Sequence, residues 1–323
     1  MSAALARLRA FLAAWPQAAL VEVGEAKGST PREEGAWMLV SPAAIFGTIG
    51  GGQLEFMAID KARELLGRVQ ATGDVDAAPH PPSGHLLPVN GEKEIGRDLA
   101  ASPSPRSRGE GGGSRMRGGA MAAESSVTLD VPLGPQIGQC CGGRVKVEIV
   151  LADAALRAAV LERVEREEGQ RPHVVIFGGG HVGHALADAL SLLPLAVSIV
   201  ETRPEQIGDL AEGVEARLTA MPEEAVRDAP PGSAFLVLTH DHALDFLIVA
   251  EALKRTDAAY VGMIGSKTKR ATFASWYRKE VGGGEAELAR LVCPIGGAAV
   301  KDKRPAVIAA MAAAEVMLAL SAR

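Results

Sequence analysis

The chain is poor in cysteine, in aromatic residues and in positive charge. Three of its 323 residues are cysteine, too few for a disulfide framework and typical of a protein from a reducing cytoplasm. Its formal net charge is −5, whereas nucleic-acid-binding proteins carry a basic patch or stripe, so we expect no nucleic-acid partner. No window holds the roughly 18 apolar residues that a membrane span needs, and Arg7 and Arg9 interrupt the apolar N-terminus as they would not in a signal peptide. These absences predict a soluble cytoplasmic protein without a membrane contact.

The segment 79–126 differs in composition from the sequence on either side. It contains Pro-Pro, Ser-Pro-Ser-Pro and Gly-Glu-Gly-Gly-Gly-Ser, and it has no phenylalanine, tryptophan or tyrosine. Such a stretch cannot bury enough apolar surface to offset the entropy lost on ordering. Its arginines would suit a docking patch, but Glu92, Glu94, Asp98 and Glu110 nearly balance them. We therefore expect a disordered insert.

Two blocks of different texture flank this insert. Residues 1–150 combine a few short strand patterns with helical ones, which predicts one α+β domain interrupted by the insert. A helical linker is expected at 151–168. From 169 to 323, short apolar strands alternate with helical patterns, which predicts a Rossmann-like, doubly wound parallel sheet. The strands are expected at 19–23, 37–40, 126–131, 145–151, 173–177, 196–200, 234–239 and 260–264.

A glycine-rich fingerprint follows the first strand of the second block. Gly178 permits a tight turn, Gly180 lets a pyrophosphate approach the backbone, and Gly183 allows the helix to pack closely on the strand. Glu201 ends the next expected strand, where an acidic residue accepts a hydrogen bond from a ribose hydroxyl. Arg203 leaves room for a phosphate or another anionic group. This pattern predicts a dinucleotide-type site, although the fold alone does not establish a redox function.

Two further loops are expected at the carboxyl edge of the same sheet. The first, Thr239-His-Asp-His-Ala-Leu-Asp245, could ligate a metal or move protons, or it could be a turn in which Asp241 caps the following helix. The second carries Lys267, Lys269 and Arg270, which would suit either an anion site or the solvated start of a helix.

The first block offers glycine loops and a pair of thiols. Gly50, Gly51 and Gly52 can present successive amides to an anion, and Arg32 can clamp a phosphate bidentately. Cys140 and Cys141 are adjacent, a poor arrangement for a structural disulfide, and glycines flank them on both sides. Thiols presented to a ligand are one interpretation, and small buried hydrophobes are the other. Together these features suggest a large ligand that combines a phosphate with a thiophilic centre.

Seven motifs in order resemble the XdhC/CoxI family. They cover both blocks and leave out the insert. The motifs are Gly-Ser-Thr-Pro-Arg (28–32), Gly-Thr-Ile-Gly-Gly-Gly (47–52), Gly-Gln-Cys-Cys-Gly-Gly (138–143), Phe-Gly-Gly-Gly-His-Val-Gly (177–183), Thr-His-Asp-His-Ala-Leu-Asp (239–245), Ile-Gly-Ser-Lys-Thr-Lys-Arg (264–270) and Cys-Pro-Ile-Gly (293–296).

The resemblance implies a chaperone for the molybdenum cofactor. It implies that the protein binds molybdopterin-bound molybdenum, protects it while a cysteine desulfurase adds the sulfido ligand, and delivers it to the molybdenum subunit of apo-xanthine dehydrogenase. Cys140 or Cys141 would then contact the molybdenum, since thiolates suit it, and Arg32 with Gly50–Gly52 would hold the phosphate or pterin. Gly178, Gly180, Gly183 and Glu201 would add pterin or nucleotide contacts or a partner surface.

Two departures from the family pattern bear on these implications. CoxI-type relatives often carry a cysteine after the second glycine loop, where this chain has Gln53, so the candidate thiols here are Cys140 and Cys141. The 79–126 insert also looks foreign to the family.

A rival hypothesis is an NAD(P)-dependent oxidoreductase that uses the Rossmann fingerprint, with His240 or His242 as the acid or base. A third is a scaffold that bridges the desulfurase and the dehydrogenase and binds no pterin. Whether the apolar closing helix near the C-terminus packs internally or forms a homodimer seam stays open at this point.

Overall fold

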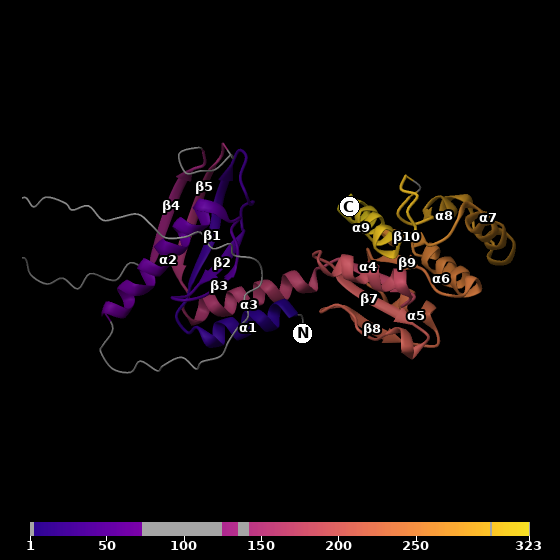
Figure 1. Ribbon diagram of the computed structural model, residues 1–323, viewed down its shortest axis with the longest axis horizontal. Helices are drawn as coiled ribbons and strands as arrows, with labels where there is room; N and C mark the ends of the chain where they lie inside the picture. Colours follow the sequence, from indigo (N-terminus) through magenta and orange to yellow (C-terminus); the bar gives the residue numbers. More distant parts are fainter. Residues whose placement is uncertain (1–2, 73–124, 135–141, 298, 323) are drawn as a thin grey trace, which may run out of the picture. The chain divides into compact units, whose positions relative to one another are not determined.

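The structure, a computed structural model, describes residues 3–72, 125–134, 142–297 and 299–322. It divides into two compact units, which are described separately (Figure 1). Trp15–Asp153 form the N-terminal unit, and Met1–Ala14 with Ala154–Arg323 form the C-terminal unit. Residues 79–124 of the expected insert lie outside the described residues, and so do Cys140 and Cys141.

The N-terminal unit is an antiparallel sheet with one helix across it (Figure 1). Its strands lie in the order β3-β2-β1-β5-β4. Along β5, the buried Val145, Val147 and Ile149 alternate with the exposed Arg144 and Glu148, which is the period of a half-buried strand. The apolar side of α2 covers the buried face. The elements are β1 Ala19–Lys27, β2 Trp37–Val40, β3 Ile45–Gly47, α2 Gly52–Thr72, β4 Ser126–Pro132 and β5 Arg144–Leu151.

The described part of β4 corrects one boundary. The expected insert ran to residue 126, but Ser126 already pairs with Val150 as the first residue of β4. The apolar side chains of this strand, which alternate with polar ones, add to the core under α2, and so the strand continues back to this residue.

The first helix belongs to the C-terminal unit, not to the N-terminal domain expected at 1–150. α1 (Ala3–Ala14) packs along α3 (Ala154–Gly169), the helix expected as a linker at 151–168. Leu8 of α1 and Val160 of α3 are buried, and Arg9 pairs with Glu165 at 2.5 Å. Burial of this apolar stripe explains why a helix so far away in sequence joins the second unit.

The C-terminal unit confirms the expected Rossmann-like fold. Its six parallel strands lie in the order β11-β10-β9-β6-β7-β8, which is the strand order of dinucleotide-binding sheets (Figure 1). Val174 and Ile176 of β6 face a core formed with α4 and α9, and Val175 and Phe177 face another formed with α5 and α6. Burial on both faces accounts for the uninterrupted apolar runs in these strands.

The bounds of these elements are β6 His173–Phe177, α4 His181–Ser191, β7 Ala196–Glu201, η2 Pro204–Gln206, β8 Glu215–Leu218, α5 Pro222–Asp228, β9 Ala234–Val237, α6 His242–Lys254, β10 Tyr260–Met263, α7 Lys267–Trp276, η3 Tyr277–Val281, α8 Glu285–Ala289, β11 Leu291–Val292 and α9 Pro305–Ser321. Two of the strands, β8 and β11, carry no strong sequence pattern, because β8 is a largely exposed edge and β11 has two residues. Within the described ranges, no helix is both long and apolar enough to span a bilayer.

Candidate functional site

Two glycine motifs meet where β1 ends and β5 begins. The pairing of Lys27 with Arg144 brings Gly28 and Ser29 beside Gly142 and Gly143. A Cβ on Gly143 would lie 2.5 Å from the Lys27 carbonyl oxygen and 2.6 Å from that of Ser29. Side chains do not tolerate such contacts, so glycine at 143 is what allows the two backbones to touch.

A third motif, at the start of α2, packs on the same loop, residues 28–32. Gly50 has φ +122°, and a Cβ there would lie 2.7 Å from the Cβ of Pro31 and 3.0 Å from the Cγ of Arg32. Gly50 and Gly143 thus pack on one loop, which carries Arg32, and a ligand shared by these residues stays a prediction. Cys140 and Cys141 directly precede Gly142 in sequence but lie outside the described residues.

Three amides of this glycine loop, those of Ile49, Gly50 and Gly51, have acceptors within the chain. The Oε2 atom of Glu55 accepts hydrogen bonds from the amides of Ile49 (3.0 Å) and Gly51 (3.1 Å) and from the Thr48 hydroxyl (2.5 Å). The Gly50 amide donates to the Thr48 hydroxyl at 3.0 Å. Phosphate binding by Gly50–Gly52 therefore stays a prediction, and so does anion binding by Arg32, which is exposed.

Sequence reasoning missed Glu55. Acidic residues are favoured in the first turn of a helix, and Glu55 lies in the first turn of α2. That signal was available in the sequence.

The fingerprint glycines of the C-terminal unit pack against the backbone. Gly178 has φ +115°, and a Cβ there would lie 2.4 Å from the Leu238 carbonyl oxygen. A Cβ on Gly183 would lie 2.0 Å from the Gly178 carbonyl oxygen, so α4 can approach the loop only at a glycine. No described atom lies within 4 Å of a Cβ built on Gly180, and a ligand can approach the backbone at that position.

Glu201 closes this glycine loop from the end of β7. Its side chain is 3% exposed, and it accepts hydrogen bonds from the amides of Gly179 (2.8 Å) and Thr202 (2.8 Å) and from the Arg203 guanidinium. Burial raises the pKa of this carboxyl, but the Arg203 and backbone donors outweigh burial and lower the pKa to about 2. Binding of a ribose by Glu201 stays a prediction, and the ribose hydroxyl would have to compete with these donors for the carboxylate oxygens.

The turn after Glu201 also covers the glycine loop. A Cβ on Gly179 would lie 2.2 Å from the carbonyl oxygen of Gln206, and the His184 ring nitrogen Nε2 lies 3.0 Å from the same oxygen. The backbone of η2 therefore rests directly on Gly179. A ligand can therefore approach the backbone of this loop at Gly180 but not at Gly179.

The loop after β9 is a helix cap. The Asp241 side chain accepts a hydrogen bond from the Ala243 amide at 2.8 Å, which confirms the capping alternative. His240 and His242 are exposed. Among the residues that the structure describes, no group of three or more histidine, cysteine or acidic side chains is arranged to hold a metal.

The basic run at the start of α7 has structural partners. Lys269 forms an ion pair with Asp245, which is fully buried and also accepts from the amide (2.9 Å) and the hydroxyl (2.7 Å) of Thr239. Arg270 donates to the carbonyl oxygens of Leu288 and Leu291. Two of the three cations considered for an anion site are thus committed to holding neighbouring loops together.

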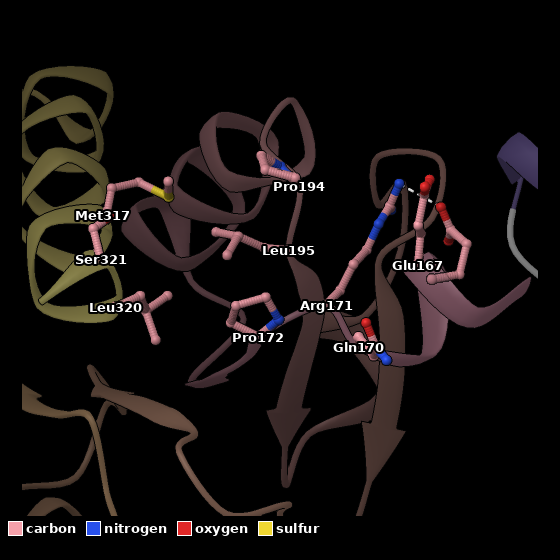
Figure 2. A pocket seen from close by; sticks show the side chains of 10 residues that line it. Glu167, Gln170, Arg171, Pro172, Pro194, Leu195, Met317, Leu320 and Ser321 are labelled. Atoms are coloured by element: carbon pink, nitrogen blue, oxygen red, sulfur yellow. Dashed lines mark ion pairs between the residues drawn. The ribbon is translucent and has the colours of Figure 1, made fainter. Parts of the chain in front are cut away.

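A cavity of about 410 Å³ lies at the opposite end of the same sheet (Figure 2). Pro172 and Leu195 line it just before β6 and β7 begin, and Met317 and Leu320 line it from the end of α9. Parallel sheets of this kind bind ligands at their carboxyl ends. This cavity, at the amino ends, is therefore separate from the glycine fingerprint.

Comparison with known proteins assigns both units to one family. The model described as the XdhC and CoxI family matches residues 12–73, and the model described as the XdhC Rossmann domain matches residues 174–316. The chain belongs to the XdhC/CoxI family, and the two matches lie in the units that carry the two glycine fingerprints.

Two similar proteins extend this result. An uncharacterized protein of Escherichia coli (strain K12), YqeB, is 24% identical over 286 residues, which are 86% of this chain and 39% of that protein. This chain thus spans about two fifths of the length of that curated relative. A solved structure from Bacillus halodurans, described as a xanthine dehydrogenase, shares the fold with a TM-score of 0.69 at 16% identity, over 100% of this chain and 97% of that one.

The backbone contact at Gly143 yields a first prediction. We expect Gly143→Ala to destabilise the N-terminal unit by about 1–3 kcal/mol, because the new methyl group has no space against two carbonyl oxygens. Gly142→Ala is the matched control, since no described atom lies within 4 Å of a Cβ there, and we expect a change within about 0.5 kcal/mol. Hydrogen exchange of the β1 and β5 amides measures both. Equal effects of the two substitutions would contradict the contact.

Glu201 yields a pH-dependent prediction. Its folded pKa of about 2 lies below its ordinary value of 4.5, so its contribution to stability is complete above pH 4.5 and is lost as the pH falls toward 2. We expect the difference in free energy of unfolding between the wild type and Glu201→Gln to shrink over that range. Urea unfolding of both proteins at several pH values measures it, and a difference that does not vary with pH would show that the carboxylate is not held in this way.

The buried ion pair yields a third prediction. Lys269→Met leaves the Asp245 carboxylate buried without its cation, so we expect a loss of about 3 kcal/mol in the stability of the C-terminal unit. Lys254→Met, at an exposed pair with Glu251, is the control, with an expected change of at most about 0.5 kcal/mol. Hydrogen exchange of the β9 amides reports on this unit. A loss at Lys269 no larger than the loss at Lys254 would refute the prediction.

Proposed function

We propose that this protein serves the maturation of xanthine dehydrogenase as a carrier of the molybdenum cofactor. It binds the molybdopterin-bound metal, protects it while a cysteine desulfurase adds the sulfido ligand, and delivers it to the molybdenum subunit of the apoenzyme. The observation that carries the proposal is the packing of Gly50 and of Gly142–Gly143 on one loop, residues 28–32, which carries Arg32. Membership of the XdhC/CoxI family supports the same conclusion.

The residues at this place have the chemistry that such a cargo requires. Arg32 is exposed and lies against Gly50, where its guanidinium can bind the terminal phosphate of the pterin with two parallel hydrogen bonds. No described atom lies within 4 Å of a Cβ built on Gly51 or Gly142, so a flat ring can approach the backbone at these two positions. Cys140 and Cys141 precede Gly142, and a thiolate from either suits molybdenum.

On this proposal the protein is an accessory factor in the cytoplasm and carries out no reaction itself. The C-terminal unit contributes further pterin or nucleotide contacts at Gly180, where the backbone is open to a ligand, or a surface for the partner proteins or a second copy. The alternative, an NAD(P)-dependent oxidoreductase, would need a ribose hydroxyl to compete with the present donors for the Glu201 carboxylate and His240 or His242 to act as the acid or base.

Metal and pterin content tests the proposal. After anaerobic incubation with molybdenum cofactor, we expect the wild type to retain molybdenum and pterin in nearly equal amounts and the Cys140→Ser/Cys141→Ser variant to lose at least about nine tenths of both, because the thiolates hold the metal. Cys293→Ser is the matched control. That third cysteine is half-buried in the other unit, and we expect its variant to retain the cofactor.

Other results would decide against the proposal. Retention by neither the wild type nor the control would rule out a carrier, and reduction of a substrate with added NAD(P)H would favour the oxidoreductase. Cofactor retention by the double serine variant would leave a carrier whose thiols are not ligands.

A further inference from the structure

One oxygen of Glu55 organises the glycine loop at the start of α2. The Oε2 atom collects the Thr48 hydroxyl and the amides of Ile49 and Gly51, three donors that would otherwise face solvent or a ligand. Glu55 lies in the first turn of α2, where the positive end of the helix dipole also stabilises its negative charge. The carboxylate therefore fixes the conformation of residues 48–51.

The loop 48–51, fixed by Glu55, sets the position of Arg32. Gly50, between the two amides that Glu55 holds, lies against Pro31 and the Cγ of Arg32. The loop that carries Arg32 is fastened at its base, where the Glu34 carboxylate accepts from the Ala26 amide at 3.2 Å. Its other end touches Gly143 through Ser29. Pro31 and Arg32, at the tip of this loop, therefore pack on Gly50, and the hydrogen bonds of Glu55 to the neighbouring amides fix Gly50.

The same geometry determines which group can bind an anion. A phosphate that bound the amides of Ile49 and Gly51 would have to displace the Glu55 carboxylate, which belongs to the same chain and is already in place. The negative charge of that carboxylate also repels the phosphate. The Arg32 guanidinium carries a full positive charge on an exposed side chain beside that loop. Glu55 therefore excludes the phosphate from the amides and leaves it to the arginine.

We propose that Glu55 is a positioning residue that fixes Arg32 for the phosphate monoester of the bound ligand, and that the amides of Ile49, Gly50 and Gly51 do not bind that phosphate. The inference rests on the proposed function, which supplies a pterin bearing one phosphate. It also deepens that function, because it assigns the recognition of the phosphate to one side chain and its support to another.

A double-mutant cycle on the full chain tests the proposal. The probes are molybdopterin and the same pterin after enzymatic removal of its phosphate. We expect Arg32→Ala and Glu55→Ala each to weaken molybdopterin binding about tenfold, roughly the effect of one charge-assisted hydrogen bond, and the double variant to be no weaker than either. Binding of the dephosphorylated pterin should not change in any variant.

Conservative and distant variants separate positioning from folding. Glu55→Gln keeps an oxygen for the Ile49 and Gly51 amides, so we expect it to bind molybdopterin nearly as well as the wild type. Glu64→Ala, on the same helix but paired with Lys61 at the surface, should have no effect. Multiplicative losses in the double variant, or an equal loss of the dephosphorylated pterin, would overturn the proposal.

A ligand-free measurement distinguishes this inference from the proposed function. We expect hydrogen exchange over residues 28–32 to be about tenfold faster in Glu55→Ala than in the wild type and unchanged in Glu55→Gln. If the wild type binds no pterin while exchange behaves in this way, the carrier function fails but Glu55 still positions Arg32. Unchanged exchange in Glu55→Ala would overturn the positioning role itself.

Discussion

Backbone that touches backbone, with no side chain between, is the constraint on which the candidate site depends. Gly143 lies directly on the carbonyl oxygens of Lys27 and Ser29, and Gly50 lies on Pro31. Two segments that are far apart in sequence can pack on the same loop, residues 28–32, only because these positions lack a Cβ. The strand pairing of β1 with β5 supplies the register, and the glycines supply the close approach. A ligand at this place would meet main-chain atoms and the ends of Arg32 and its neighbours.

In both units, acidic side chains accept hydrogen bonds from the backbone amides of glycine residues. Glu55 accepts from Gly51, Glu201 from Gly179, Glu287 from Gly284 and Glu315 from Gly296, the last three at 2.8 Å. Each carboxylate is built into the chain, so it has a large advantage over an anion that arrives from solution. Glycine amides in this protein are therefore partly committed to its own architecture. Selection of an external anion falls to exposed cations and to positions such as Gly180, where the space above the backbone is open.

The sequence predicts the fold well, but it predicts poorly which side chains and loops contact one another. Apolar runs such as 173–177 and the alternation in 145–151 indicate strands, because burial on two faces or on one leaves a direct periodicity. The glycine spacing predicts the turn at Gly178 for the same local reason. Glu201 and Asp245 each have a donor from another loop, the Gly179 amide and Lys269, and no local pattern shows that Lys269 will reach Asp245 or that Gln206 will cover Gly179. Short edge strands such as β11 depend on their neighbours in the same way.

The pairing of α1 with α3 makes the N-terminal unit an insertion within the C-terminal one. Its first and last strands leave side by side, with Ala19 opposite Leu151 and the Ala152 amide donating to the Ala18 carbonyl at 2.8 Å. During synthesis, α1 leaves the ribosome before its partner exists, and Leu5, Leu8 and Leu12 have no α3 to cover them until the whole intervening unit has been made. The N-terminal unit can thus complete its fold first, and α1 finds its partner once α3 has been made, before the parallel sheet of the C-terminal unit follows.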